Sequence, residues 1–231
     1  MTRVWVTRAE PGATGSAEKL RALGFMVTVA PLLAVRQIDV RPIDVANIGA
    51  IAFTGSNAVR AFASQTPVRT IPAYAVGQAT AEAAISAGFA VRRIGQGDVA
   101  ALAQAIIGDF GGDPGAVLIP GPVEPAGDLV GALATGRIEA RLLKIYETLP
   151  AELPADFHLT LPLISIVALY SPKAARGLVQ VLARWPSPHL RVFCLSAAVA
   201  APVAGTDLAQ ICVAALPNEA SLLSLFTDLR C

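Results

Sequence analysis

Residues 51–62 read I-A-F-T-G-S-N-A-V-R-A-F. A short apolar run that can form a buried strand is followed by four small or polar residues, Thr54 to Asn57, and a helical pattern then begins at once. Ser56 or Asn57 would cap such a helix by accepting its free backbone N–H groups. A strand that leads directly into a helix whose first turn has no bulky side chains also forms a site where the helix N-terminus can bind an anion. The stretch predicts a strand–turn–helix unit and leaves both roles open for its polar residues.

The composition indicates a globular chain with a large core. Of 231 residues, 54% are hydrophobic and 15% are charged, which is enough for one large domain or two small ones. The longest stretches without charge or histidine, 159–172 and 192–206, contain proline and are too short to span a membrane. The beginning of the chain does not read as a signal peptide. We therefore expect a soluble, cytoplasmic protein.

The charge balance limits the possible partners. A net charge of +1 leaves no broad basic face, so we expect no nucleic acid as a partner. An acidic ligand would be held locally, by a few basic side chains and backbone N–H groups.

Apolar runs alternate with alanine-rich helical segments along the whole chain, which is typical of an α/β fold with mostly parallel sheets. Glycines stand where helices should stop, at Gly24, Gly88, Gly136 and Gly205. The expected strands are 3–7, 26–30, 51–54, 73–76, 91–94, 116–120, 138–143, 164–170, 191–195 and 211–215, and the expected helices are 14–23, 56–64, 78–87, 98–108, 125–134, 173–184, 197–204 and 218–229.

The chain also repeats itself. Residues 51–62 align with V-A-L-Y-S-P-K-A-A-R-G-L at 167–178, and 74–81 align with 193–200, among five pairings in the same order. Any two α/β halves share strands and helices, but the repeated small, polar strand ends are more specific. Parallel strands place their carboxyl ends on one edge, where ligands bind. Two such domains facing each other would form a cleft suited to a ligand with several carboxylates or phosphates.

Common catalytic motifs are missing from the sequence. It contains no complete G-x-G-x-x-G, no Walker A sequence and no C-x-x-C spacing. Its two histidines, His158 and His189, lie in proline-flanked connections. We find no spacing for a metal site or a Ser-His-Asp group, and we therefore expect neither a metal nor an organic cofactor.

Five segments together resemble one enzyme family over nearly the whole chain. They are V-T-R at 6–8, F-T-G-S-N-A-V at 53–59, A-V-G-Q-A-T-A at 75–81, Y-E-T at 146–148 and Y-S-P-K-A-A at 170–175. In this combination the sequence resembles the uroporphyrinogen-III synthase family. It departs from the family pattern at Pro120-Gly121 and at Leu195-Ser196-Ala197.

The resemblance implies a fold and a division into domains. The family has two similar α/β domains with mostly parallel sheets flanked by helices, joined by a two-stranded β connector in a discontinuous, swapped arrangement. Here, residues 1–36 plus 150–231 would form the first domain and 41–146 the second. Residues 37–40 and 147–149 would be the connector strands. The residues alone equally allow two contiguous halves.

The resemblance also implies the reaction. The family is a cyclising lyase of porphyrin, tetrapyrrole and heme biosynthesis that closes hydroxymethylbilane to uroporphyrinogen III. Water is lost, and ring D inverts through a spiro intermediate in the interdomain cleft. Without the enzyme the ring closes without inversion, so the protein must steer the substrate, mainly by orientation and electrostatics. The family precedent is a monomer.

Candidate residues follow from the matched motifs. Tyr146 aligns with the tyrosine of the family's Y-x-T and would be a general acid for the departing hydroxyl, or else a packing residue of the connector. For Arg8 and Lys173 the alternative is an exposed, solvated charge. The residues expected to bind substrate carboxylates are Arg8, Thr54, Gly55, Ser56, Asn57, Gly77, Thr80, Ser171 and Lys173.

Two other functions fit facing α/β domains. One is a two-domain sugar-nucleotide transferase, and the other is a non-catalytic, hinge-closing protein that binds a small molecule. Only the synthase would turn hydroxymethylbilane into the type III isomer.

Overall fold

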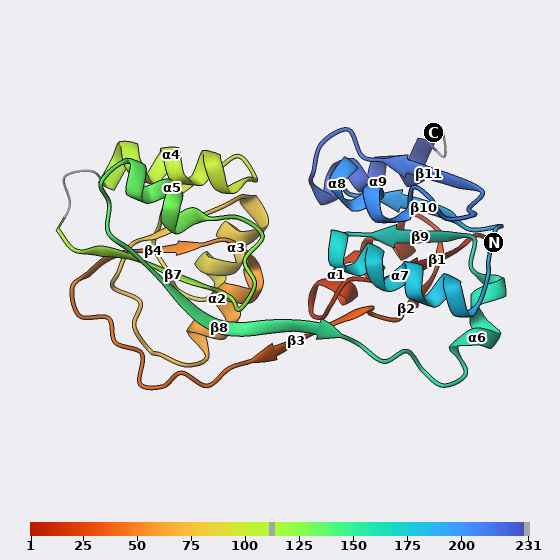
Figure 1. The fold of residues 1–231 in the computed structure, drawn as a ribbon, viewed down its shortest axis with the longest axis horizontal. Helices are drawn as coiled ribbons and strands as arrows, with labels where there is room; N and C mark the ends of the chain where they lie inside the picture. The colour runs from red at the N-terminus through yellow and green to blue at the C-terminus, as the bar shows by residue number, and fades with distance from the viewer. Residues whose placement is uncertain (111–113, 229–231) are drawn as a thin grey trace. The chain divides into compact units, whose positions relative to one another are not determined.

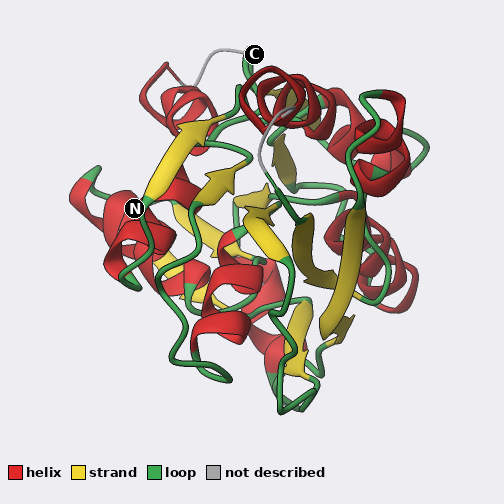
Figure 2. Ribbon diagram, turned by 90° about the vertical axis from the view of Figure 1, so that its left-hand side faces the viewer, coloured by secondary structure: helices red, strands yellow, loops and turns green. Residues whose placement is uncertain are grey.

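The computed structural model describes residues 1–110 and 114–228, and the chain forms two α/β units. The first unit contains residues 1–34 and 149 onward, and the second is Val35–Thr148. Each unit is built on its own sheet, and helices flank the strands of both (Figures 1 and 2). The expected α/β fold with mostly parallel sheets is confirmed.

The sheet of the first unit combines strands from both ends of the chain. Its order is β11-β10-β9-β1-β2, and each of its neighbouring pairs is parallel. In β1, Val4 lies opposite Val27 of β2 on one side and Ile166 of β9 on the other. The strands are β1 (Arg3–Val6), β2 (Met26–Val29), β9 (Ile166–Leu169), β10 (Arg191–Cys194) and β11 (Gln210–Val213).

Both faces of the three inner strands, β10, β9 and β1, are buried, which explains why these strands read as nearly continuous apolar runs. Trp5 points into a core that includes Leu178 of α7, whereas Val4 and Val6 pack with Phe226 of α9 on the other face. The helices are α1 (Gly12–Ala22), α6 (Phe157–Thr160), α7 (Pro172–Arg184), α8 (Ala197–Ala200) and α9 (Glu219–Asp228), with 3-10 turns at Leu161–Leu163 and Ala201–Val203.

The second unit contains a six-stranded sheet in the order β3-β8-β7-β4-β5-β6. The strands from β8 to β6 in this order pair in parallel. The strands are β3 (Leu33–Gln37), β4 (Ile48–Phe53), β5 (Ala73–Ala75), β6 (Val91–Ile94), β7 (Ala116–Pro122) and β8 (Ala140–Pro150), and the helices are α2 (Ser56–Ala63), α3 (Gln78–Ser86), α4 (Val99–Phe110) and α5 (Leu129–Thr135).

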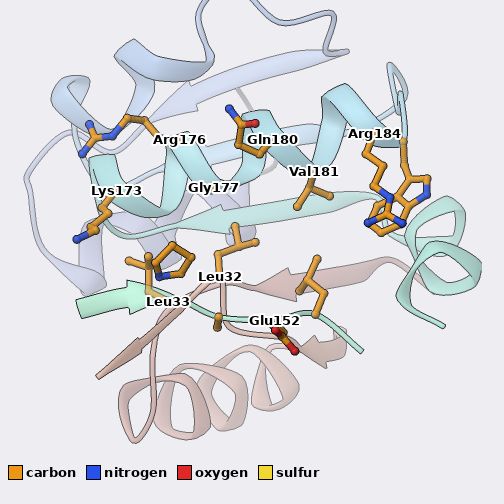
Figure 3. Close-up of a pocket in the computed structure, with 13 residues that line it drawn as sticks. Leu32, Leu33, Glu152, Lys173, Arg176, Gly177, Gln180, Val181 and Arg184 are labelled. Atoms are coloured by element: carbon orange, nitrogen blue, oxygen red, sulfur yellow. The ribbon is translucent and has the colours of Figure 1, made fainter. Parts of the chain in front are cut away.

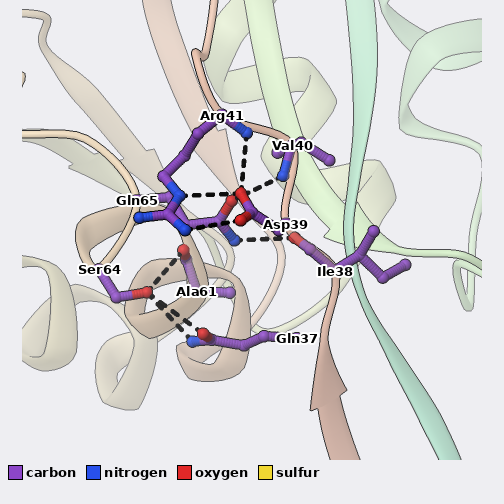
Figure 4. A network of polar contacts seen from close by, with 8 residues as sticks. All are labelled: Gln37, Ile38, Asp39, Val40, Arg41, Ala61, Ser64 and Gln65. Atoms are coloured by element: carbon purple, nitrogen blue, oxygen red, sulfur yellow. Dashed lines mark hydrogen bonds and ion pairs between the residues drawn. The ribbon is translucent and has the colours of Figure 1, made fainter.

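The segment that follows β3 is fixed to the end of α2 (Figure 4). The side-chain amide of Gln65 donates to the carbonyl of Ile38 at 2.9 Å and accepts from the backbone N–H of Val40 at 2.9 Å. Next to them, the guanidinium of Arg41 binds both carboxylate oxygens of Asp39 and keeps the pKa of Asp39 well below its usual value. Gln65 therefore satisfies the carbonyl of Ile38 and the N–H of Val40, while the N–H of Ile38 donates to the carbonyl of Ile145 in β8.

Most expected elements occur within a few residues of their predicted bounds, and the exceptions have local causes. Strand β3, Leu33–Gln37, begins and ends a few residues before the connector strand expected at 37–40. The helix expected at 125–134 begins only at Leu129, where Asp128 caps it. Gly136 is predicted to stop this helix, but the residue with a left-handed backbone there is Arg137, with φ 58°. A Cβ on Gly136 would lie 2.6 Å from Cγ1 of Ile107, so this glycine is needed for close packing.

The helices of both units are short. Within residues 1–110 and 114–228, none is long and apolar enough to cross a membrane.

Candidate active site

Helix α2 begins directly beyond β4 and is not capped by a side chain. Its N-cap, Gly55, has an extended backbone with φ 176°. The hydroxyl of Ser56 donates to the carbonyl oxygen of Ala79 at 3.1 Å, and Oδ1 of Asn57 accepts from Arg60 at 2.6 Å. The capping role that the sequence allowed for Ser56 or Asn57 is therefore wrong. The first turn of α2 keeps backbone N–H donors available at the strand end.

Helix α3 begins beside it in the same way. It follows β5, the neighbour of β4, and its N-cap Gly77 is again extended and has no side-chain cap. Thr80 is buried in its first turn, with 5% of its surface exposed. Thr54–Asn57 and Gly77–Thr80 thus lie at the same edge of one sheet, where the hydrogen bond from Ser56 to Ala79 joins them.

A cavity of about 150 Å³ opens at the same edge of the second unit. Its walls combine the ends of β4, β7 and β8 with the turn before α5. It contains two of the residues expected from the sequence, Thr54 and Tyr146. The other lining residues are Val99, Ile119, Gly121, Pro122, Pro125, Ala126, Gly127, Asp128, Leu129, Val130 and Leu142.

Tyr146 is the most deeply buried hydroxyl-bearing residue of this cavity. It lies near the end of β8 and is 8% exposed, and its ring packs in the core cluster that contains Phe53 and Val59. Burial raises the pKa of Tyr146, and the positive charge of Arg60 opposes this effect. The phenol therefore stays protonated near neutral pH and can donate its proton or a hydrogen bond.

Sequence reasoning missed two polar residues of this region. Asp128 lines the cavity, and its carboxylate caps α5 by accepting from the N–H of Gly131 at 2.8 Å. An Asp directly before the apolar run of α5 is a typical capping signal and could have identified it. Arg60 lies on the second turn of α2, where nothing in the sequence connects it with Tyr146, which is 86 positions further along the chain.

In the first unit, the residues expected to bind substrate are Arg8, which follows β1, and Ser171 and Lys173, which follow β9. Nη1 of Arg8 donates to Oγ of Ser16 at 3.1 Å and forms an ion pair with Glu219 at 3.2 Å. Ser171 caps α7 by accepting from the N–H of Ala174 at 3.1 Å. Arg8 is therefore no freely solvated charge, and the hydroxyl of Ser171 is occupied by its helix.

Lys173 lines a second and larger cavity, of about 730 Å³, in the first unit (Figure 3). This groove runs along α7, and Leu32 and Leu33 form part of its apolar wall. Arg176 and Arg184 add two more basic residues, and the guanidinium of Arg184 lies 4.7 Å from the centre of the Trp185 ring. The structure thus separates Lys173 from Arg8, since only Lys173 faces this groove.

The histidines do not lie at the carboxyl ends of the strands. His158 stacks near Trp185, with 6.0 Å between ring centres, and Nε2 of His189 lies 3.1 Å from the carbonyl oxygen of Ile164. Among the residues that the structure describes, no group of three His, Cys, Asp or Glu side chains could hold a metal ion.

The model of one protein family, described as uroporphyrinogen-III synthase HemD, matches residues 15–224. The fold is similar to a uroporphyrinogen-III synthetase from Helicobacter pylori 26695, with a TM-score of 0.71, 17% identity and 100% of both chains covered. It is also similar to a mutant uroporphyrinogen III synthase from Thermus thermophilus, with a TM-score of 0.56, 17% identity, and 99% of this chain and 98% of that one covered. No curated protein sequence matches.

Proposed function

The chain belongs to the uroporphyrinogen-III synthase family, and on that premise we propose that the strand-end edge of its second unit holds the substrate during ring closure. The protein is accordingly a cyclising lyase of tetrapyrrole and heme biosynthesis, which turns hydroxymethylbilane into uroporphyrinogen III. The family match favours this function over a sugar-nucleotide transferase or a hinge-closing binding protein.

One observation carries the location of the site: the two neighbouring, uncapped helix starts of α2 and α3. Their N–H donors and the positive ends of their dipoles favour carboxylates. The substrate carries acetate and propionate arms, and the extended glycines Gly55 and Gly77 let such an arm approach the backbone. Thr54, Ser56, Asn57 and Thr80 surround these positions and complete the proposed binding edge.

Tyr146 is the proposed general acid. Its phenol is protonated at neutral pH and lines the cavity with Thr54. As the bond between the terminal carbon and its hydroxyl breaks, the phenol proton passes to the departing oxygen and water leaves. The pyrrole nitrogen supplies the electrons that expel the hydroxyl, and transfer of the pyrrole N–H proton back to the phenolate then gives the neutral azafulvene and restores Tyr146. Proton donation of this kind contributes about 10²- to 10⁴-fold to a rate.

The remaining steps require the protein to control the orientation of ring D relative to the other rings. Ring D is attacked through its substituted carbon, and the spiro intermediate reopens and closes again with ring D inverted. The protein has to hold the other rings while ring D turns, which orientation and preorganised dipoles achieve. In the first unit, Lys173 would add positive charge for a carboxylate arm, while Ser171 would contribute by fixing the start of α7.

The protein is proposed to act as a cytoplasmic monomer without nucleic acid. Its charge of +1 gives no basic face that would attract a polyanion.

Product analysis tests the function. The protein is mixed with hydroxymethylbilane, the products are oxidised to porphyrins, and the type I and type III isomers are separated. We expect mainly type III, whereas the substrate alone gives type I. Formation of type I at the uncatalysed rate in the presence of the protein would contradict the proposal.

A further inference from the structure

Arg8 is held by contacts on several sides of its guanidinium. Nη1 binds Ser16 at 3.1 Å and Glu219 at 3.2 Å, and the guanidinium carbon lies 4.7 Å from the centre of the Tyr170 ring. These partners come from α1, from the start of α9 and from the end of β9. We call these partners, together with Gly12, the arginine seat; it consists of Gly12, Ser16, Tyr170 and Glu219. The seat joins segments that are far apart in the sequence.

Gly12 gives the seat its shape. A Cβ at this position would lie 2.6 Å from Nε, 2.8 Å from Cζ and 2.9 Å from Nη2 of Arg8. No side chain larger than glycine fits there unless the guanidinium moves. The backbone of α1 is therefore in close contact with Arg8, and the guanidinium has little freedom to turn.

Part of the hydrogen-bonding capacity of the guanidinium is unused within the seat. Nη1 donates to Ser16 and Glu219, whereas Nε and Nη2, the nitrogens nearest to Gly12, donate to no side chain or backbone group among the described residues. About a third of the Arg8 side chain, 35%, is exposed. Lys19 also binds the Glu219 carboxylate, so one negative charge faces two positive ones and the cluster keeps a net positive charge.

Glu219 is ionised, which helps to keep Arg8 in place. Burial opposes its ionisation, but hydrogen bonds from Lys19 and Ser16 and the charge of Arg8 outweigh burial and lower the pKa of Glu219. At neutral pH it is a carboxylate that accepts from all three residues. Arg8 therefore does not have to be ordered again when a ligand binds, which lowers the entropic cost of binding.

We propose that the arginine seat orients Arg8 so that its free Nε and Nη2 edge binds one carboxylate of the tetrapyrrole substrate. Arg8 is the binding residue, and Gly12 and Glu219 are positioning residues that act through it. A planar pair of N–H donors matches the two oxygens of a carboxylate. The inference rests on the proposed function for the nature of the ligand, and it assigns the first unit an anchor of its own.

Two glycines of α1 provide a matched test. In the full-length protein, Gly12→Ala would place a methyl group against the guanidinium, whereas a Cβ on Gly15 meets nothing within 4 Å. Alanine favours the helix more than glycine does, so Gly15→Ala should keep the melting temperature at or above its original value, and in Gly12→Ala this gain should offset the weaker contacts of the displaced Arg8 and keep the melting temperature near its original value. We expect Gly12→Ala to raise the KM for hydroxymethylbilane by about 10- to 100-fold, as the loss of a charged hydrogen-bonded pair would, with kcat within about twofold. Gly15→Ala should leave both constants unchanged.

A double variant shows whether Gly12 acts through Arg8. Arg8→Gln alone should raise KM as Gly12→Ala does, and the combination of both should be no worse than Arg8→Gln alone. Equal KM values for the Gly12→Ala and Gly15→Ala proteins, or multiplied effects in the double variant, would overturn the seat as a carboxylate anchor. The isomer ratio of the unmodified protein reports on the proposed function separately, because it does not depend on the seat.

Discussion

The hydroxyl of Ser56 donates a hydrogen bond to the carbonyl oxygen of Ala79 across 3.1 Å. This contact joins the first residue of α2 to the first turn of α3, and it holds together two helix starts that no side chain caps. Ser56 thus contributes to the candidate site by fixing the spacing of two sets of backbone N–H donors.

Ser56→Ala should lower the free energy of unfolding by about 1 kcal/mol, because one neutral hydrogen bond is lost. The KM for hydroxymethylbilane should rise a few-fold, because the two helix starts become less well fixed. Denaturant unfolding and steady-state kinetics measure both effects. Thr135→Ala is the control, since its hydroxyl donates to Ala132 within α5. It should change stability little, because alanine favours the helix, and it should leave KM unchanged. An equal rise in KM for both variants would count against the site.

Gly55 tests whether a carboxylate approaches α2. Its extended backbone suits any residue, and a Cβ would meet nothing within 4 Å, so substitutions should leave the fold intact. Gly55→Glu should raise KM at least about tenfold, because it places a negative charge where an anionic arm binds. Gly55→Gln has the same size without the charge and should have a smaller effect. If the two variants have the same KM, charge at this position is irrelevant.

Tyr146→Phe should lower kcat by about 10²-fold, because the ring remains and only the proton donor is lost. The melting temperature should change little. Tyr74→Phe is a suitable control, because Tyr74 is fully buried in the same unit and does not line the cavity. Loss of the phenol proton at high pH should also lower kcat. Because the pKa of Tyr146 is raised above the usual value of about 10, this decrease should begin only above that pH. Unchanged turnover in Tyr146→Phe would make the residue purely structural.

Glu219 should make stability depend on pH in a predictable direction. Because folding lowers its pKa, its stabilising contribution is complete above the unfolded value of about 4.3 and is lost as the pH falls through the lower folded value. Unfolding free energies of the wild type and of Glu219→Gln, measured at several pH values, should differ by a constant amount between pH 6 and 8. The difference should shrink in acid. A difference that grows below pH 4 would have the wrong sign.

The proposed division into domains can be tested with fragments. Residues 41–146 with their ends joined should unfold cooperatively by themselves, because they contain β4 to β7, the part of β8 that pairs with β7, and α2 to α5. Residues 1–115 should not fold, because β1 lacks β9 and β4 lacks β7. Circular dichroism during heating measures both. Cooperative unfolding of 1–115 would favour contiguous halves.

Local signals explain why so much of the fold could be predicted. Gly24 and Gly88 end helices with φ values of 88° and 89°, as a helix stop requires. The stretch from Thr54 to Asn57 marked a strand end and a helix start, and both occur there. Helix α6 was missed because four residues between prolines carry almost no periodic pattern.

The candidate site was only partly predictable, because its contacts join distant residues. The sequence pointed to Thr54, Gly77 and Tyr146, but the cavity that brings Tyr146 to Thr54 depends on the pairing of β7 with β4 and β8. Nothing in the sequence connects Arg8 with Glu219, which is 211 positions further along the chain. Such a pair becomes visible only when the sheet is known.

The pairing of β1 with β9 also bears on how the protein is made by the ribosome. Val4 cannot pair with Ile166 until that residue has been synthesised, and the second unit is already complete at Thr148. At about 5–20 residues per second, the interval between the two strands is roughly 8 to 30 seconds. During translation the apolar segment around Trp5 has no complete sheet to join. The nascent chain should therefore be open to chaperones and proteases at its N-terminus until its last third has emerged.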